Sequence, residues 1–170
     1  MRHMRRAAVV LATLAVAGCA SLGALGQFVQ APRFAAASGQ PATLRLVGPS
    51  SQHPLGGVAV RLWARVENPN SFGLTLASLA GNLYLQGQRA ADVSFPLGLP
   101  LRAAADTVIP LDVAIGFADL PGLRDVATRA LSGNPISYRL DGTAAIDAGP
   151  LGQPSFGPMT LLQGALEARR

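Results

Sequence analysis

Few residues of this 170-residue chain have side chains suited to acid–base, nucleophilic or metal chemistry. The chain has a single cysteine, Cys19, and two histidines, of which His3 lies at the extreme N-terminus and His53 stands alone. An active site needs convergent titratable groups, and the HExxH, GxSxG and phosphate-loop motifs do not occur. We therefore predict no catalytic residue, no metal site and no cofactor, and an enzyme is the least favoured class.

The chemistry expected at Cys19 is attachment of a lipid such as palmitate. Arginines at positions 2, 5 and 6 precede an almost wholly apolar stretch that ends in Val16-Ala17-Gly18-Cys19. This pattern is typical of a secretory signal peptide, and the apolar run is shorter than the about 20 residues that cross a bilayer. The ending resembles the lipobox of bacterial lipoproteins, which implies cleavage after Gly18 and lipidation of Cys19. An ordinary signal peptide cleaved at a nearby Ala-x-Ala site is the alternative.

Charge and composition exclude several classes of protein. After residues 1–18 the chain keeps 11 arginines against nine acids and has no lysine, so its net charge is close to neutral. The arginines are scattered, whereas a nucleic-acid-binding protein shows a basic stripe or an aromatic platform. The content of 49% apolar and only 14% charged residues predicts a folded chain and not a disordered one. We expect no nucleic-acid partner, and the oligomeric state stays open.

Apolar and polar residues alternate with a period of two along most of the chain, which predicts strands. The expected strands are 42–48, 57–67, 78–86, 91–97, 107–115, 136–146 and, less clearly, 159–166. Pro110 indicates an edge strand or a bulge. Residues 119–135 instead place apolar side chains at spacings of three and four, which predicts one helix, with Asp119 as N-cap, Pro121 in the first turn and Gly133 at its end.

This pattern favours an all-β fold: an antiparallel β-sandwich, fibronectin III- or immunoglobulin-like, with one short helix late in the chain. An eight-stranded closed barrel is the main alternative. We expect residues 1–18 to be the signal peptide, 19–31 the lipidated cysteine and tether, and 32–170 the domain. Packing of Phe28 and Val29 on the domain is an equally open reading of the tether.

The stretch "VENPNSFGL", residues 66–74, interrupts the strand pattern. Asn68 precedes a proline, Pro69 fixes a turn dihedral, and Asn70 tolerates the unusual backbone geometry that follows. Asparagine amides bond nearby backbone groups in such turns, so we interpret this element as a self-satisfied structural corner. A ligand-binding role for the two amides is the alternative.

Trp63 is the side chain best placed for an interaction surface. Arg61 and Arg65 share its face of the predicted strand and could flank the ring, with Tyr84 beside them. A tryptophan covered by a neighbouring strand is the simpler interpretation of the same pattern.

The strand ending in Asn68-Pro69-Asn70 is followed by "LTLASLAGNLYLQGQRAADVSF", then by "LPLRAAADTVIPLDVAI" and by "FADLPGL". This order resembles the late embryogenesis abundant type 2 family, with its water stress and hypersensitive response (WHy) domain, over roughly residues 40–166. The resemblance implies a β-sandwich with a small helix, no catalysis, and an association with desiccation tolerance and stress response.

Together, the resemblance and the lipobox lead us to expect a non-enzymatic lipoprotein of the cell envelope. We expect it on the periplasmic side of the outer membrane or at the cell surface, because the residue after Cys19 is not aspartate. It would be held to the membrane by its lipid anchor, and its partners would be client proteins protected under water stress. An envelope assembly module and an apolar-ligand carrier with a cavity between the sheets are the alternatives.

Overall fold

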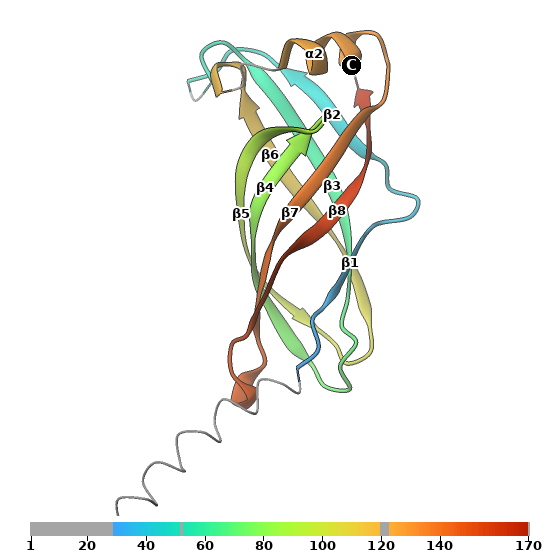
Figure 1. The fold of residues 1–170 in the computed structure, drawn as a ribbon, viewed down its shortest axis with the longest axis vertical. Helices are drawn as coiled ribbons and strands as arrows, with labels where there is room; N and C mark the ends of the chain where they lie inside the picture. The colour runs from blue at the N-terminus through green and yellow to red at the C-terminus, as the bar shows by residue number, and fades with distance from the viewer. Residues whose placement is uncertain (1–28, 52, 120–122, 170) are drawn as a thin grey trace, which may run out of the picture.

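The computed structural model describes residues 29–51, 53–119 and 123–169. Within these ranges, eight strands run along the long axis, and one α-helix lies at one end (Figure 1). The strands are β1 (Arg33–Ala36), β2 (Ala42–Val47), β3 (Gly57–Glu67), β4 (Leu74–Leu85), β5 (Gln88–Leu101), β6 (Asp106–Gly116), β7 (Ile136–Asp147) and β8 (Ser155–Arg169). The helix is α2 (Leu123–Leu131), and two 3₁₀ turns are η2 (Phe117–Asp119) and η3 (Gly149–Leu151).

The strands form two layers that enclose one core. In the first layer β3 pairs with β6 on one side, and with β1 and β2 one after the other on the opposite side. In the second layer the order is β8, β7, β4, β5. The two layers are joined where β2 pairs with β8, and this pair is parallel. The predicted all-β sandwich with one short helix is confirmed, and the parallel pair is a departure from a purely antiparallel sheet.

The alternation of the sequence places the core between the layers. In β3 the even-numbered side chains from Val58 to Val66 are almost fully buried, while Arg61 and Arg65 are exposed. In β4 the buried positions shift from even to odd numbers after Leu76, because a bulge interrupts its pairing between Leu76 and Ser78. Burial of each large apolar side chain contributes roughly 1.5–3 kcal/mol, so this pattern is the main force that holds the layers together.

The helix is confirmed, with shorter bounds than the sequence indicated. Val126 and Ala130 are buried against the core, whereas Leu131, expected in the same apolar stripe, is 64% exposed because the helix ends there. Gly133 ends the helix as predicted: its φ is +68°, and the amide of Asn134 donates to the carbonyl of Arg129. These are features of a Schellman cap. The predicted first turn at Pro121 lies outside the described residues, as does the lipidation site.

The domain begins earlier than the expected boundary at residue 32. Val29 is buried in the core, and the short strand β1, which the sequence did not reveal, pairs with the C-terminal half of β3. β1 escaped prediction because its four residues, Arg-Phe-Ala-Ala, are too few to show a period-two pattern of apolar and polar residues. The described chain therefore enters the domain at the end of the molecule opposite α2 (Figure 1).

Two glycines let strands β4 and β7 approach unusually closely. Gly81 and Gly142 face each other in the register of the pair. A Cβ atom on Gly81 would lie 2.0 Å from the carbonyl oxygen of Asp141, and one on Gly142 would lie 2.3 Å from that of Ala80. Both distances are far below van der Waals contact. Close backbone packing of β4 and β7 therefore explains these two glycines.

We expect Gly142→Ala to lower the free energy of unfolding by about 2 kcal/mol or more, because the two strands must separate to admit the methyl group. Gly48→Ala is the matched control, since nothing lies within 4 Å of its added Cβ. Urea denaturation of both variants measures the difference. Equal stability of the two variants would contradict the close approach.

Candidate functional site: the asparagine corner and the outer face of β3

The corner between β3 and β4 contains the two side chains that stand out most in the structure. Asn68 is 0% and Asn70 is 3% exposed, and within the described residues they are the only buried polar side chains. The corner carries the chain from the first layer to the second. Burial of an amide without hydrogen bonds costs several kcal/mol, so the partners of these two side chains decide what the corner does.

Asn68 binds the turn between β5 and β6. Its side-chain Nδ2 donates to the carbonyl oxygens of Phe72 at 2.9 Å and of Arg102 at 3.0 Å. The backbone amide of Asn68 donates to the carbonyl of Ala105 at 2.9 Å. The turn from residue 101 to residue 106 also passes between the layers. Asn68 therefore fastens the two layer-crossing connections to each other.

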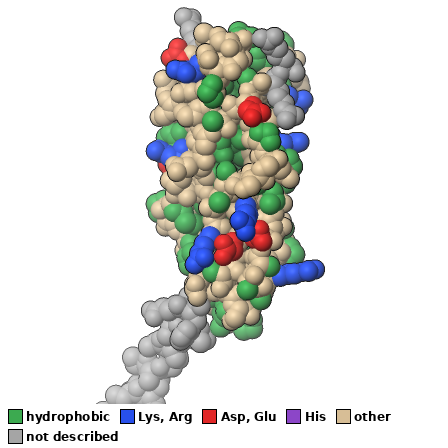
Figure 2. All heavy atoms as spheres, turned by 90° about the vertical axis from the view of Figure 1, so that its right-hand side faces the viewer, with side chains coloured by type: hydrophobic (Ala, Val, Ile, Leu, Met, Phe, Trp, Pro, Cys, Tyr) green, Lys and Arg blue, Asp and Glu red, His purple; other side chains and the backbone are tan. Residues whose placement is uncertain are grey.

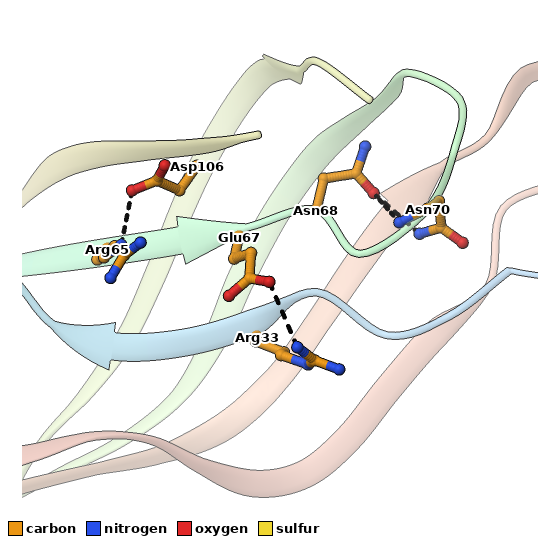
Figure 3. A network of polar contacts seen from close by, with 6 residues as sticks. All are labelled: Arg33, Arg65, Glu67, Asn68, Asn70 and Asp106. Carbon is orange, nitrogen blue, oxygen red and sulfur yellow. Dashed lines mark hydrogen bonds and ion pairs between the residues drawn. The ribbon is translucent and has the colours of Figure 1, made fainter. Parts of the chain in front are cut away.

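Asn70 binds the start of the domain. Its Oδ1 accepts a hydrogen bond from the backbone amide of Gln30 at 2.8 Å, and its Nδ2 donates to the carbonyl of Gln30 at 2.9 Å. Asn70 Nδ2 also donates to Asn68 Oδ1 at 2.9 Å, which links the two amides (Figure 3). The pair joins three segments that lie 33 to 40 residues apart in sequence.

This outcome corrects one part of the sequence interpretation. We predicted a corner satisfied by nearby backbone, and the turn does contain two such bonds. The backbone amide of Asn70 donates to Asn68 Oδ1 at 3.0 Å, and Asn68 Nδ2 donates to the carbonyl of Phe72 at 2.9 Å. The side-chain amides, however, mostly reach Gln30 and Arg102, which local turn chemistry could not reveal. All four side-chain amide hydrogens are engaged, so the two asparagines offer no free donor to a ligand.

The outer face of β3 carries the predicted interaction patch in altered form. Arg61 donates from Nε and Nη2 to both carboxylate oxygens of Asp112 on β6, at 2.7 and 2.9 Å. Arg65 Nε donates to Asp106 at 2.6 Å. Trp63 lies between them, half-buried and opposite Pro110 in the register. Both arginines are thus directed to carboxylates on β6, and the sequence analysis missed these partners.

The residue on β6 that follows Pro110 along this face, Val108, is also apolar. Arg65 lies opposite Val108, which is 41% exposed. Trp63, Pro110 and Val108 therefore form a short apolar strip, hereafter the Trp63 strip, with an ion pair at either end. Side chains at every second position of two antiparallel strands face each other on one side of the sheet. This rule would have found the strip from the sequence, had the register of β3 and β6 been known.

Tyr84 does not belong to this patch. It lies on β4, in the second layer, and three strands, β2, β8 and β7, separate β4 from β3 along the sheet. Its neighbour is Arg139 on β7, whose guanidinium carbon lies 4.9 Å from the centre of the Tyr84 ring. The expectation that Tyr84 stands beside Trp63 is therefore wrong, because strands that follow each other in sequence here fall in different layers.

The charged side chains of the outer surface are largely paired. The described ion pairs are Arg33–Glu67, Arg61–Asp112, Arg65–Asp106, Arg89–Asp92 and Arg139–Asp141. Figure 2 shows basic and acidic side chains side by side on one face of the molecule. Near the corner, the acids Glu67 and Asp106 face each other across β3 and β6, and Arg33 and Arg65 neutralise them (Figure 3).

One of these pairs shifts the ionisation of its members. The hydrogen bond from Arg61 lowers the pKa of the Asp112 carboxyl, and the same bond raises the pKa of Arg61. In the core, burial raises the pKa of the Tyr138 hydroxyl. A carboxylate held ionised by an arginine accepts a proton poorly, so the outer face of β3 is built for polar contact more than for proton transfer.

In residues 29–51, 53–119 and 123–169, no group of three or more histidine, cysteine or acidic side chains is placed to bind a metal ion. Within the same ranges, no helix has the length and hydropathy to cross a bilayer.

A two-layered all-β protein with a buried asparagine pair at one end is the class that this fold defines. The chain belongs to the late embryogenesis abundant protein family, whose model matches residues 64–159. That segment runs from the middle of β3 into β8 and includes the asparagine corner.

Solved structures agree with this fold. A solution structure of an Arabidopsis thaliana protein matches with a TM-score of 0.53 and 16% identity, over 78% of this chain and 83% of that one. The solution structure of a protein described as a late embryogenesis abundant (LEA) protein matches with a TM-score of 0.53 and 18% identity, over 96% of this chain and 86% of that one. No curated protein matches the sequence significantly.

We expect Asn68→Ala to lower the free energy of unfolding by about 3 kcal/mol, because it leaves the carbonyl of Arg102 and the amide of Asn70 buried without partners. The control is Asn82→Ala, whose side chain accepts a hydrogen bond only at the surface, from Arg89. Chemical denaturation measures both variants. A loss for Asn68→Ala no larger than that for Asn82→Ala would contradict the corner's structural role.

The Asp112 pair predicts a pH dependence. A carboxyl group whose pKa is lower in the folded than in the unfolded state adds stability above its unfolded pKa and loses it as the pH falls through the folded value. The stability of the wild type should therefore fall in acid through this window. In a plot of denaturation midpoint against pH, the fall at acidic pH should be shallower for Asp112→Asn than for the wild type. An unchanged limb would mean that the Arg61 contact does not hold in solution.

Proposed function

We propose that this protein is a lipid-anchored, non-enzymatic protein of the cell envelope that protects proteins or envelope components during water stress by surface binding. Membership of the late embryogenesis abundant protein family is the observation that carries the stress-related role. The signal-like segment and Cys19 support the envelope location and the anchor. The proposed location is the periplasmic side of the outer membrane or the cell surface.

The entry of the chain into the domain fits an anchor. Nine residues separate Cys19 from the buried Val29, so the domain can lie at most about 35 Å from a lipid on that cysteine. The Gln30–Asn70 hydrogen bonds then hold the chain entry beside the corner. We infer that the corner faces the membrane and that α2 faces away from it.

The paired surface suits a protein that must survive drying. Exposed ion pairs contribute little in water, but the attraction between opposite charges grows as the surrounding dielectric constant falls. When water is withdrawn, the pairs on β3 and β6 keep each charge neutralised within the same molecule. The fold therefore should persist under conditions in which isolated surface charges lose their solvation.

Contact with clients would involve the Trp63 strip. It combines an aromatic ring, a proline and the exposed Val108 with ion pairs at both ends, an arrangement of apolar centre and polar rim that protein interfaces share. The same observation favours a second candidate function, an envelope assembly module that docks one partner there. Strand addition at the edges is less favoured, because Pro96, Pro100 and Pro110 interrupt the donors of β5 and β6.

Protection is tested with a desiccation-sensitive enzyme dried and rehydrated in the presence of the protein. We expect the enzyme to keep more activity than with an equal mass of an inert globular protein, and Trp63→Ala to reduce the benefit. Tyr84→Ala removes an aromatic ring from the other layer and is the control. Protection equal to that of the inert protein would refute the role, and crosslinking to one dominant partner would favour the assembly module.

A further inference from the structure

The outer face of β2, β3 and β6 contains an open trough of about 970 Å³. It lies nearer the α2 end than the Trp63 strip does, since it starts at Arg61 and extends toward the N-terminal end of β3. Two rows of the sheet form it. Thr43, Arg61 and Asp112 pair across the strands in one row, and Arg45, Ala59 and Ala114 pair in the next.

Small residues keep the trough open. Ala59 and Ala114 occupy the centre of the second row, between Arg45 on one side and the free edge of β6 on the other. Longer side chains at these two positions would fill the space beside the Arg61–Asp112 pair. The methyl groups of Ala59 and Ala114 share the face of Arg45 and Arg61, so the trough also offers an apolar contact.

Arg45 is the cation that this site leaves without a partner. Within the part of the chain that the structure describes, its guanidinium group makes no hydrogen bond or ion pair. Its charge nevertheless reaches the site, because it helps to lower the pKa of Asp112. With two guanidinium groups against one carboxylate, the side chains that line the trough carry an excess positive charge.

Arg61 is held in place for a second contact. Both oxygens of Asp112 accept hydrogen bonds from it, which fixes the plane of its guanidinium group. Two of its five N–H groups are used in this way, and three remain. A guanidinium oriented before binding loses little freedom when an anion arrives, and the engaged Asp112 oxygens repel that anion less than a free carboxylate would.

We propose that the trough binds a phosphate group of a small organic molecule or of a lipid headgroup through Arg45 and Arg61. A phosphate group has more free oxygens than a carboxylate, so two guanidinium groups can each donate to different oxygens of it, whereas a carboxylate has only two oxygens for both. Thr43 lies at the same edge of the trough, and Ala59 and Ala114 would contact the carbon part of the ligand. The site goes beyond the proposed protective role and does not depend on it.

The experiment uses the full chain reconstituted in phosphatidylcholine vesicles and titrated with inorganic phosphate and with glycerol 3-phosphate. Trp63, the only tryptophan, is two residues from Arg61 and reports binding by its fluorescence. We expect saturable binding of glycerol 3-phosphate that Arg45→Gln weakens by about tenfold or more, the loss typical of a charge-assisted hydrogen bond. Ala114→Leu should also weaken binding, because it fills the floor without changing a charge.

The control is Arg89→Gln, which removes the same charge from β5 in the other layer and should bind as the wild type does. Denaturation midpoints establish that each variant folds. Replacement of part of the phosphatidylcholine by phosphatidylglycerol shows whether the bound phosphate group belongs to a lipid headgroup or to a soluble molecule. If the headgroup occupies the site, the fluorescence shifts before any soluble ligand is added, and this shift requires Arg45. Binding lost equally in Arg45→Gln and Arg89→Gln, or no saturable response to any phosphate probe, would overturn the proposal.

Discussion

The hydrogen bonds of two buried asparagine amides hold this fold together at the end where its chain enters. Strand pairing holds each layer of the sandwich together, but the connections that cross between layers must be fixed separately. Asn68 fastens the β5–β6 turn to the β3–β4 corner, and Asn70 fastens the start of the domain to both. Because every partner is buried or partly buried, the network is stable only when it is complete.

The side chains on the outer face of β3 change in character with distance from this corner. Close to it, arginines from β1 and β3 neutralise acids that face each other. Farther along β3 the apolar Trp63 strip follows, and beyond Arg61 lies the trough with its unpaired Arg45. One face of one strand thus offers three different kinds of contact. A surface that binds clients weakly and a site for a phosphate group can coexist on it, with the Arg61–Asp112 pair as the part that they share.

The sequence predicted the features that depend on neighbouring residues, such as strands and a helix end. It did not predict contacts between residues that lie far apart in the chain. Period-two alternation located β3 to the residue and placed Val58 to Val66 in the core, and Gly133 marked the end of the helix. It did not reveal that Asn70 reaches Gln30, or that Asp112 pairs with Arg61, because neither contact has a local signature. Tyr84 was misplaced for the same reason: alternation tells which face a residue occupies, and only topology tells which layer.

Hydrogen exchange at the backbone amides of Gln30 and Asn70 tests the central claim most directly, because the side-chain oxygens of the asparagine pair accept both. Gln30 precedes the first strand, so without the network its amide would exchange nearly as fast as that of an unstructured peptide. We predict protection of both amides close to that of the β3 core, lost only on global unfolding. Fast exchange of Gln30 in an otherwise protected domain would contradict the account.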